Sequence, residues 1–278
     1  MSNGFLFPPA GFGPGSQPLD DEELSYMALP SGMRTYVPHL PEVGDPSQVT
    51  PALKTLADIA GACEIAATAG GERAEFDLSA MDPASRALMA ETLGQGEVSM
   101  KLRGVPALMV QESVFAGVWM LAGAGIDRIE VGPVPAEAVR RAHGSGAPAP
   151  MLSAPRPAGV VNAPALLAEL ADQSANWRSG GMPHVVNLSL LPHTEEDLLW
   201  LDAALGKGAV TILSRGYGNC RISACALPQV WRVQFFNSMD TLILDTFEVT
   251  AIPEVALAAP EDLADSGERI REVLEAIR

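Results

Sequence analysis

The strongest constraint on the fold of this 278-residue chain is an internal repeat. Eight residues recur at a constant offset of 112 positions. They fall within a window of 27 residues, where composition alone would give roughly two identities. The identical pairs are Leu93 and Leu205, Gly94 and Gly206, Gly96 and Gly208, Val98 and Val210, Arg103 and Arg215, Gly104 and Gly216, Val118 and Val230, and Trp119 and Trp231. Positions shared by both copies should mostly build the fold, whereas function is better sought where the copies differ.

The match resumes after a six-residue insertion, where Glu130 and Val131 are repeated as Glu248 and Val249. Each copy reads as a helix, a strand, a second helix and then a small antiparallel meander. The sequence therefore predicts an α+β fold of two tandem related modules followed by a C-terminal helix. The expected segments are an N-terminal arm at residues 1–49, module one at 50–143, a linker rich in glycine, alanine and proline at 144–157, and module two at 158–278.

The shared glycines and tryptophans have structural explanations. Gly94 and Gly206 follow apolar helical patterns, and the residue just past a helix end often needs a positive φ, so both are expected to end a helix. Trp119 and Trp231 lie in predicted strands, where a large aromatic side chain is most simply part of the core.

The retained charges suggest an ion pair within each module. Arg103 and Arg215 precede glycines at predicted turns, and Glu130 and Glu248 lie in later strands of the same meanders. We therefore expect Arg103 near Glu130 and Arg215 near Glu248. The final helix carries apolar residues such as Ile270 at helical spacing and is expected to cap the second sheet.

The N-terminal arm is rich in proline and glycine, which block regular structure. An acidic run at residues 20–23 leads into Leu24, Tyr26 and Met27. Two interpretations remain open: a mobile tail, or a short arm that packs these side chains onto a partner or onto the modules. A second set of candidate partner-binding residues lies at the predicted hairpin turn of module two and comprises Phe235, Phe236 and Asn237.

The charge balance argues against several classes of partner. The formal net charge is −16, and only three of the 18 basic residues are lysine, namely Lys54, Lys101 and Lys207. Nucleic acid and anionic membrane surfaces are therefore poor candidates. The first residues lack a signal-like pattern, and the longest nearly apolar run, residues 114–126, is too short to span a bilayer. We expect a cytoplasmic protein.

The sequence offers no set of nucleophile, base and orienting residue, so we expect no enzyme. The repeated Leu-Gly-x-Gly-x-Val pattern lacks a third glycine and runs from helix to strand, the reverse of a phosphate-binding turn. His184 and His193 have no metal-ligand spacing around them. We therefore expect no cofactor and no metal.

The copies diverge at the cysteines. Cys220 aligns with Leu108, and Cys225 aligns with Ser113. Their separation of five places them on opposite faces of a strand, so they do not form a chelating pair. Cys63 lies in an apolar helical stripe and reads as a small buried hydrophobe. Cys220 remains a candidate reactive thiol or soft ligand.

Several stretches resemble a known family. They are residues 93–98, 111–119, 215–222, 230–238, 248–249 and 253–263, with residues 29–36 of the arm. In these stretches the chain is similar to the hydrogenase expression/formation proteins of the HupH/HyaF type, and the resemblance covers nearly the whole chain. Cys220 lies inside the matching Gly-Tyr-Gly-Asn-Cys-Arg segment.

The resemblance implies an accessory role in the maturation of uptake nickel-iron hydrogenase. The implied activity is that of an assembly factor or chaperone for the iron-sulfur small subunit before export. The implied partners are the precursor of that subunit and a thioredoxin-like hydrogenase accessory protein. The family supplies no catalytic residues to transfer.

Three functional hypotheses follow. The first is a non-enzymatic chaperone that holds the small subunit through the arm and the meander face of one module. The second is an iron-sulfur or thiol redox factor that uses Cys220. The third is a scaffold homodimer that pairs through the open edge strands of its sheets.

Overall fold

The computed structural model describes Pro41, Val43 and residues 45–68, 71–143, 156–216 and 219–277. All of them belong to one compact unit, His39–Arg278. The candidate residues Leu24, Tyr26 and Met27 lie outside the described residues, as does most of the predicted linker.

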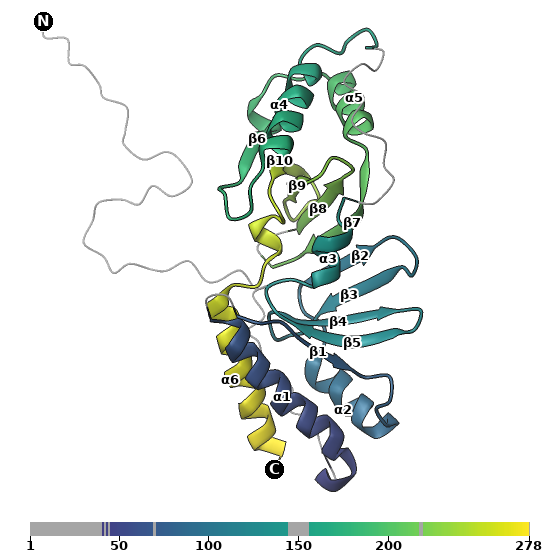
Figure 1. Cartoon of the computed structure of the whole chain (residues 1–278), viewed down its shortest axis with the longest axis vertical. Coiled ribbons are helices and arrows are strands. Elements are labelled where there is room, and N and C mark those ends of the chain that lie inside the picture. Colours follow the sequence, from purple (N-terminus) through teal and green to yellow (C-terminus); the bar gives the residue numbers. More distant parts are fainter. Residues whose placement is uncertain are drawn as a thin grey trace, which may run out of the picture. The chain divides into compact units, whose positions relative to one another are not determined.

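The described chain forms a mixed structure of helices around one antiparallel sheet of ten strands, which confirms the α+β class that the sequence predicts (Figure 1). The strands are β1 (Ala74–Asp77), β2 (Val98–Leu102), β3 (Leu108–Glu112), β4 (Val118–Gly123), β5 (Ile126–Val131), β6 (His184–Asn187), β7 (Lys207–Ser214), β8 (Asn219–Cys225), β9 (Val230–Phe236) and β10 (Leu242–Val249). Their order across the sheet is β1-β5-β4-β3-β2-β7-β8-β9-β10-β6. The two expected meanders are thus parts of one sheet, joined where β2 pairs with β7.

The described helices are α1 (Thr50–Ala66), α2 (Pro83–Leu93), α3 (Ala136–Arg141), α4 (Ala163–Asn176), α5 (Glu195–Leu205) and α6 (Pro260–Ile277), with short 3-10 turns η1 (Pro46–Val49), η2 (Leu188–Leu190) and η3 (Glu254–Ala256). All of these α-helices except α3 cover one face of the sheet at its two ends. Val118 packs in a core with α1, α2 and α6, and Val230 packs in a second core with α4 and α5. We call the face that carries both valines the helical face.

The opposite face carries Trp119 and Trp231, which are both fully buried. They share a third core with Ala138 of α3 and Ala256 of η3. The Nε1 of Trp119 donates to the carbonyl of Gly132 at 2.9 Å, and that of Trp231 donates to the carbonyl of Thr250 at 3.2 Å. Both tryptophans are therefore core residues with a satisfied indole donor.

The helix ends follow the sequence expectation. Gly94 ends α2 with φ 52°, and Gly206 ends α5 with φ 65°. Both angles lie in the region that glycine adopts at little cost. Each glycine N–H bonds back to the carbonyl four residues earlier.

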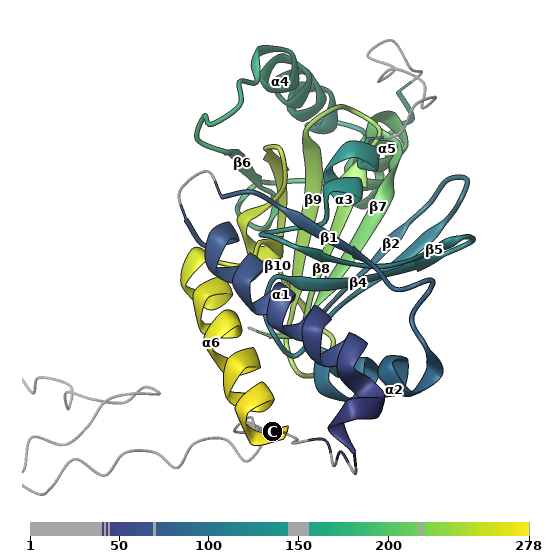
Figure 2. The same ribbon diagram turned by 60° about the horizontal axis from the view of Figure 1, so that its bottom comes forward.

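The expectation that the final helix caps the second sheet is wrong. Helix α6 packs against α1, and the two lie side by side in both views (Figures 1 and 2). Ile270 is buried in the same core as Leu56 of α1, and Gly267 lets the α6 backbone approach α1 closely. The apolar spacing of α6 specifies which residues are buried but not which surface buries them. The helix therefore returns to the first half of the sheet.

A buried carboxylate holds α4 and α5 together. One carboxylate oxygen of Asp197 accepts the backbone N–H groups of Val161, Asn162 and Ala163 at 2.8, 3.0 and 2.9 Å. The other accepts the N–H of Thr194 at 3.1 Å, which completes a capping box at the start of α5. Burial alone would raise the pKa of Asp197, but these four donors outweigh it and lower the pKa to about 2.

A second buried carboxyl has the opposite shift. Glu112 of β3 accepts the N–H of Gly117 at 3.1 Å and is 8% exposed. Burial raises its pKa to about 7, and the negative charge of Glu97 adds to the rise. The folded chain therefore favours the protonated form of Glu112.

We predict that Asp197→Asn lowers the free energy of unfolding at pH 7 by about 2 kcal/mol. The native pKa lies below the ordinary value of 3.8, so the ionised carboxylate contributes stability above that pH and loses it as the pH falls towards 2. Urea unfolding at pH 7 measures the effect. The exposed first-turn residue Glu195→Gln is the control and should cost less than about 0.5 kcal/mol. Equal losses in the two variants would contradict the role given to Asp197.

We predict that Glu112→Gln is more stable than the parent chain at pH 8, by up to about 3 kcal/mol. The folded pKa is raised from 4.5 to about 7, so Glu112 destabilises the fold progressively as the pH rises through that interval. Thermal or urea unfolding from pH 4 to 8 should show the two proteins diverging over this window. The exposed Glu72→Gln should leave the pH profile unchanged, and a constant difference for Glu112→Gln would count against the shift.

Candidate functional site

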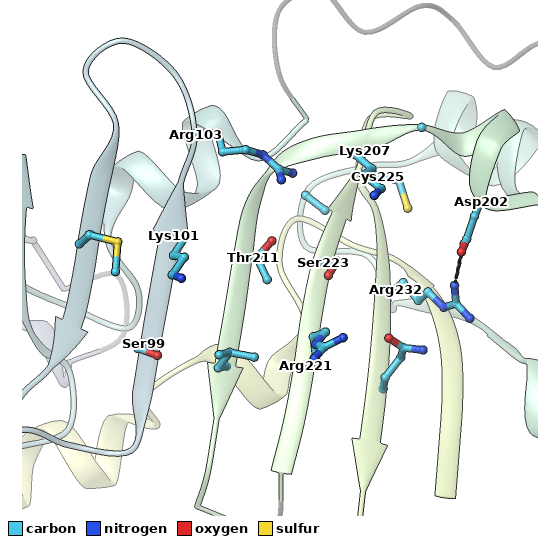
Figure 3. Close-up of a pocket in the computed structure, with 15 residues that line it drawn as sticks. Ser99, Lys101, Arg103, Asp202, Lys207, Thr211, Arg221, Ser223, Cys225 and Arg232 are labelled. Atoms are coloured by element: carbon cyan, nitrogen blue, oxygen red, sulfur yellow. Dashed lines mark hydrogen bonds and ion pairs between the residues drawn. The ribbon is translucent and has the colours of Figure 1, made fainter. Parts of the chain in front are cut away.

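The centre of the helical face is not covered by a helix and contains a groove of about 520 Å³ (Figure 3). We call it the central groove. Its floor is formed by strands β2, β3, β7, β8 and β9, and the end of α5 contributes Asp202 and Gly206 at one side. The groove therefore lies across the junction of β2 with β7.

Strand alternation aims polar side chains into the groove. Ser99 and Lys101 of β2 face it, whereas Met100 and Leu102 of the same strand are buried on the opposite face. Across the strands, Lys101 lies opposite Thr211, Thr211 opposite Ser223, and Ser223 opposite Arg232. A second row runs from Ser99 through Leu213 and Arg221 to Gln234. Each strand therefore has an apolar side in the core and a polar side in the groove.

Four cations of the groove are exposed and pair with no carboxylate in the part of the chain that the structure describes. Among the residues that the structure describes, no ion pair involves Lys101, Arg103, Lys207 or Arg221. The guanidinium of Arg103 donates to the carbonyl of Gly208, and that of Arg221 lies 5.7 Å from the centre of the Phe236 ring. The groove therefore carries positive charge that no carboxylate of the described residues neutralises by direct pairing.

Arg232 is the exception, because two carboxylates bind it. Its guanidinium contacts Asp202 of α5 and Asp245 of β10, each at 2.6 Å. Burial alone would lower the pKa of Arg232, but the hydrogen bond and charge of Asp245, with the charge of Asp202, raise it. This triad fixes α5 to the sheet and neutralises the end of the groove at β9.

The retained arginines lie at the β2–β7 junction, not beside the retained glutamates. The backbone N–H of Arg103 donates to Ala209 at 2.8 Å, and that of Arg215 donates to Glu97 at 3.2 Å. Glu130 instead binds Arg128 at 2.6 Å. In the described part of the chain no ion pair joins Arg103 to Glu130 or Arg215 to Glu248, so the expected pairs are wrong. The constant spacing between the two copies shows which residues are retained, but it does not show which residues lie next to them in the sheet.

The thiols are buried. Cys220 packs in the core behind the central strands, whereas Cys225 packs towards α5, so the two lie on opposite faces as predicted. Burial raises the pKa of Cys220 to about 11 and that of Cys63 to about 12. Burial likewise raises the pKa of Cys225 to about 12. A thiolate is the reactive and metal-binding form, so these environments disfavour redox or ligand chemistry.

The candidate residues of the second hairpin lie at the far end of β9. Phe235 is paired with Cys220, and Phe236 with Asn219. The side chain of Asn237 accepts the N–H groups of Met239 and Thr241, both at 2.9 Å, and so shapes the turn. Phe236 also lines a second hollow of about 680 Å³ that shares Leu213 and Arg221 with the central groove. Phe236 and Cys220 thus both line the second hollow, and Asn237 has a structural role in the turn.

The described residues offer neither a metal-binding cluster nor a membrane-spanning helix. No group of three or more His, Cys, Asp or Glu side chains there is arranged to hold a metal ion. No helix among them is long and apolar enough to cross a membrane.

The groove was not predicted from the sequence, although the positions of two lysines are a signal of it. Lys101 and Lys207 are two of only three lysines, and both lie in strands at the centre of the sheet. A central strand that keeps polar and charged side chains on one face implies that no helix covers that face. This signal is readable only once β2 and β7 are known to be neighbours.

Comparisons with known proteins give consistent matches. The family model described as the C-terminal conserved region of the HupH hydrogenase expression protein matches residues 49–144 and 160–277. The hydrogenase expression/formation protein HupH of Rhodobacter capsulatus is 67% identical over 278 residues, which cover 100% of both chains. HoxQ of Cupriavidus necator, also named a hydrogenase expression/formation protein, is 47% identical over 98% of both chains. The hydrogenase-1 operon protein HyaF of Escherichia coli is 33% identical over 74% of both.

We predict that Cys63, Cys220 and Cys225 resist alkylation in the folded protein. With pKa values of about 11 to 12, the thiolate fraction at pH 8 is about one in a thousand or less. Iodoacetamide labelling followed by mass spectrometry should modify the three thiols rapidly in denaturant and slowly without it. Rapid native labelling of Cys220 alone would contradict its burial and revive the thiol redox hypothesis.

Proposed function

The chain belongs to the family of HupH hydrogenase expression proteins, and on that premise we propose that it acts in hydrogenase maturation. In finer terms, we propose a non-enzymatic assembly factor or chaperone for the iron-sulfur small subunit of an uptake nickel-iron hydrogenase. It would act in the cytoplasm, before the subunit is exported. The names of the relatives support a role in hydrogenase maturation. The sequence resemblance motivates the proposal of an assembly factor or chaperone for the small subunit.

The observation that carries the proposal is the central groove. It is open along the middle of the sheet, and its walls carry exposed cations beside exposed apolar side chains such as Met109 and Leu213. Such a surface suits a protein partner better than a small substrate, because it is open and extends over five neighbouring strands. The one thiol in the groove lining, Cys225, is buried and has a raised pKa, which fits an accessory protein better than an enzyme.

The thiol alternative receives less support. A cluster or mixed-disulfide factor needs an accessible thiolate, whereas burial and raised pKa values characterise the three cysteines. The scaffold dimer would use β1 and β6, which are the edge strands of the sheet and span four residues each. Light scattering of the purified chain tests that alternative.

We also propose that the chain consists of two tandem copies of one module. Several observations support it. The strand order outward from the junction is β2-β3-β4-β5-β1 on one side and β7-β8-β9-β10-β6 on the other. Met100 and Ile212, which are 112 positions apart, face each other in the β2–β7 pair. The two tryptophan hydrogen bonds are also equivalent under the repeat.

The main test is co-purification from a strain that makes an uptake hydrogenase. A tagged full-length chain should recover the small-subunit precursor, and the thioredoxin-like accessory protein is the second expected partner. We expect the double variant Lys101→Glu with Arg221→Glu to reduce precursor recovery about tenfold, because it reverses two charges at the groove. Lys54→Glu on α1 is the matched control and should recover as much as the parent chain.

The outcomes separate the elements of the proposal. Recovery of the large subunit without the small-subunit precursor would make the proposed target wrong. Equal recovery by the groove variant and the parent chain would exclude the groove as the binding surface. Deleting residues 1–49 tests the arm, and unchanged recovery would remove it from the mechanism.

A further inference from the structure

We propose that the central groove binds an extended acidic segment of a protein partner. The inference rests on the proposed function for the existence of such a partner, and it adds the chemistry that the partner must present. Four features of the groove support it: its unpaired cations, its apolar neighbours, its polar floor and its length.

The charge distribution is the first argument. The chain has a formal net charge of −16, yet Lys101, Arg103, Lys207 and Arg221 all face one groove. Like charges gathered at one surface repel one another, and a bound anion lowers the energy of that repulsion. Several arginines elsewhere in the molecule are paired within the fold, as Arg86 is with Asp127 and Arg128 with Glu130, whereas the groove gathers four cations that form no such pair with a described residue. The groove is where carboxylates from outside would find unoccupied partners.

Two of these cations lie beside exposed apolar side chains. Lys101 lies directly opposite Met109 in the β2–β3 pair, and Arg221 lies directly opposite Leu213 in the β7–β8 pair. Met109 is 52% exposed and Leu213 is 36% exposed. Each half of the sheet thus offers one cation beside one apolar side chain. An acidic segment that also carries apolar side chains would satisfy both, whereas a free anion would use only the cations.

The floor fits a peptide main chain. Ser99, Thr211 and Ser223 place hydroxyl groups on the groove floor, and Gln234 places an amide there (Figure 3 shows the three hydroxyl residues). These groups both donate and accept hydrogen bonds, as backbone N–H and C=O groups require. Arg221 supplies a planar guanidinium that can bind a carboxylate with two parallel bonds.

The length of the groove sets the length of the segment. Five neighbouring strands at roughly 4.8 Å spacing span about 19 Å, and an extended chain rises about 3.3 Å per residue, so about six residues fit. Lys101 and Arg221 are two strands apart, on β2 and β8. Their separation of roughly 10 Å predicts two carboxylates two to four residues apart.

Nucleic acid is the less favourable polyanion. A strand long enough to leave the groove would pass over a surface that is acidic overall, and its phosphates would be repelled there. A segment of about six residues stays within the positive region. We therefore assign the groove to an acidic peptide.

The test uses the purified full-length chain and a fluorescein-labelled peptide of about twelve residues that carries glutamates spaced by leucine, glycine and serine. A matched peptide has glutamine in place of each glutamate. In fluorescence anisotropy at low salt we expect the glutamate peptide to bind at least about tenfold more tightly than the glutamine peptide. The double variant Lys101→Gln with Arg221→Gln should raise its Kd about tenfold or more, and added salt should weaken binding to the parent chain.

The controls distinguish a loss of peptide binding at the groove from a loss of folding or a general effect of charge. Lys54→Gln replaces the only lysine of the chain that does not line the groove; Lys54 lies on α1, and its replacement should leave the Kd unchanged. Both replaced groove residues are exposed and make no ion pair in the described chain, so thermal unfolding should be unaffected. Equal binding of the two peptides, an unchanged Kd in the double variant, or tighter binding of a single-stranded DNA of similar length would overturn the proposal. Since this assay needs no hydrogenase subunit, its failure leaves the co-purification test intact.

Discussion

The pairing of β2 with β7 is the interaction on which the rest of the structure depends. Val98 to Leu102 run antiparallel to Val210 to Ser214, and backbone bonds from Arg103 and Arg215 extend the ladder at its two ends. Without this pair, two five-stranded sheets would each expose an edge to other chains. With it, a single ten-stranded sheet forms whose central strands are paired on both sides.

The junction also explains why the groove exists. Each half carries helices that cover its outer strands on the helical face, and the second half keeps α4 and α5 in place through Asp197 and the Arg232 triad. Neither helical group extends over β2 and β7. The central strands therefore keep a polar surface between two apolar cores, while the opposite face is closed by α3 and the two tryptophans. An open sheet centre is a consequence of joining two helix-covered halves.

The sequence predicted what depends on local rules and missed what depends on long-range pairing. Gly94, Gly206, the tryptophans and the β9–β10 hairpin follow from helix-end geometry, burial and alternation. The positions of α6 and Arg103 do not, because amphipathic spacing and retained identity leave the neighbouring element unspecified. The groove belongs to the second group: alternation identified the outward side of β2, but only the fold shows that this side meets β7 and β8.

The groove can nevertheless be related to the repeat by comparing the positions at which the two copies differ. Lys101 corresponds to Leu213 at the offset of 112, and Met109 corresponds to Arg221. In each half one of these residues is cationic and the other is apolar. The cation lies on the first strand of the first half, β2, but on the second strand of the second half, β8. Had the second copy repeated the pair of the first, the cations would lie on β2 and β7, the two adjacent central strands, where they would repel each other most strongly. The observed arrangement instead separates Lys101 from Arg221 by the width of β7, which spreads the positive charge along the groove. Differences between the copies thus create a surface that neither half forms alone.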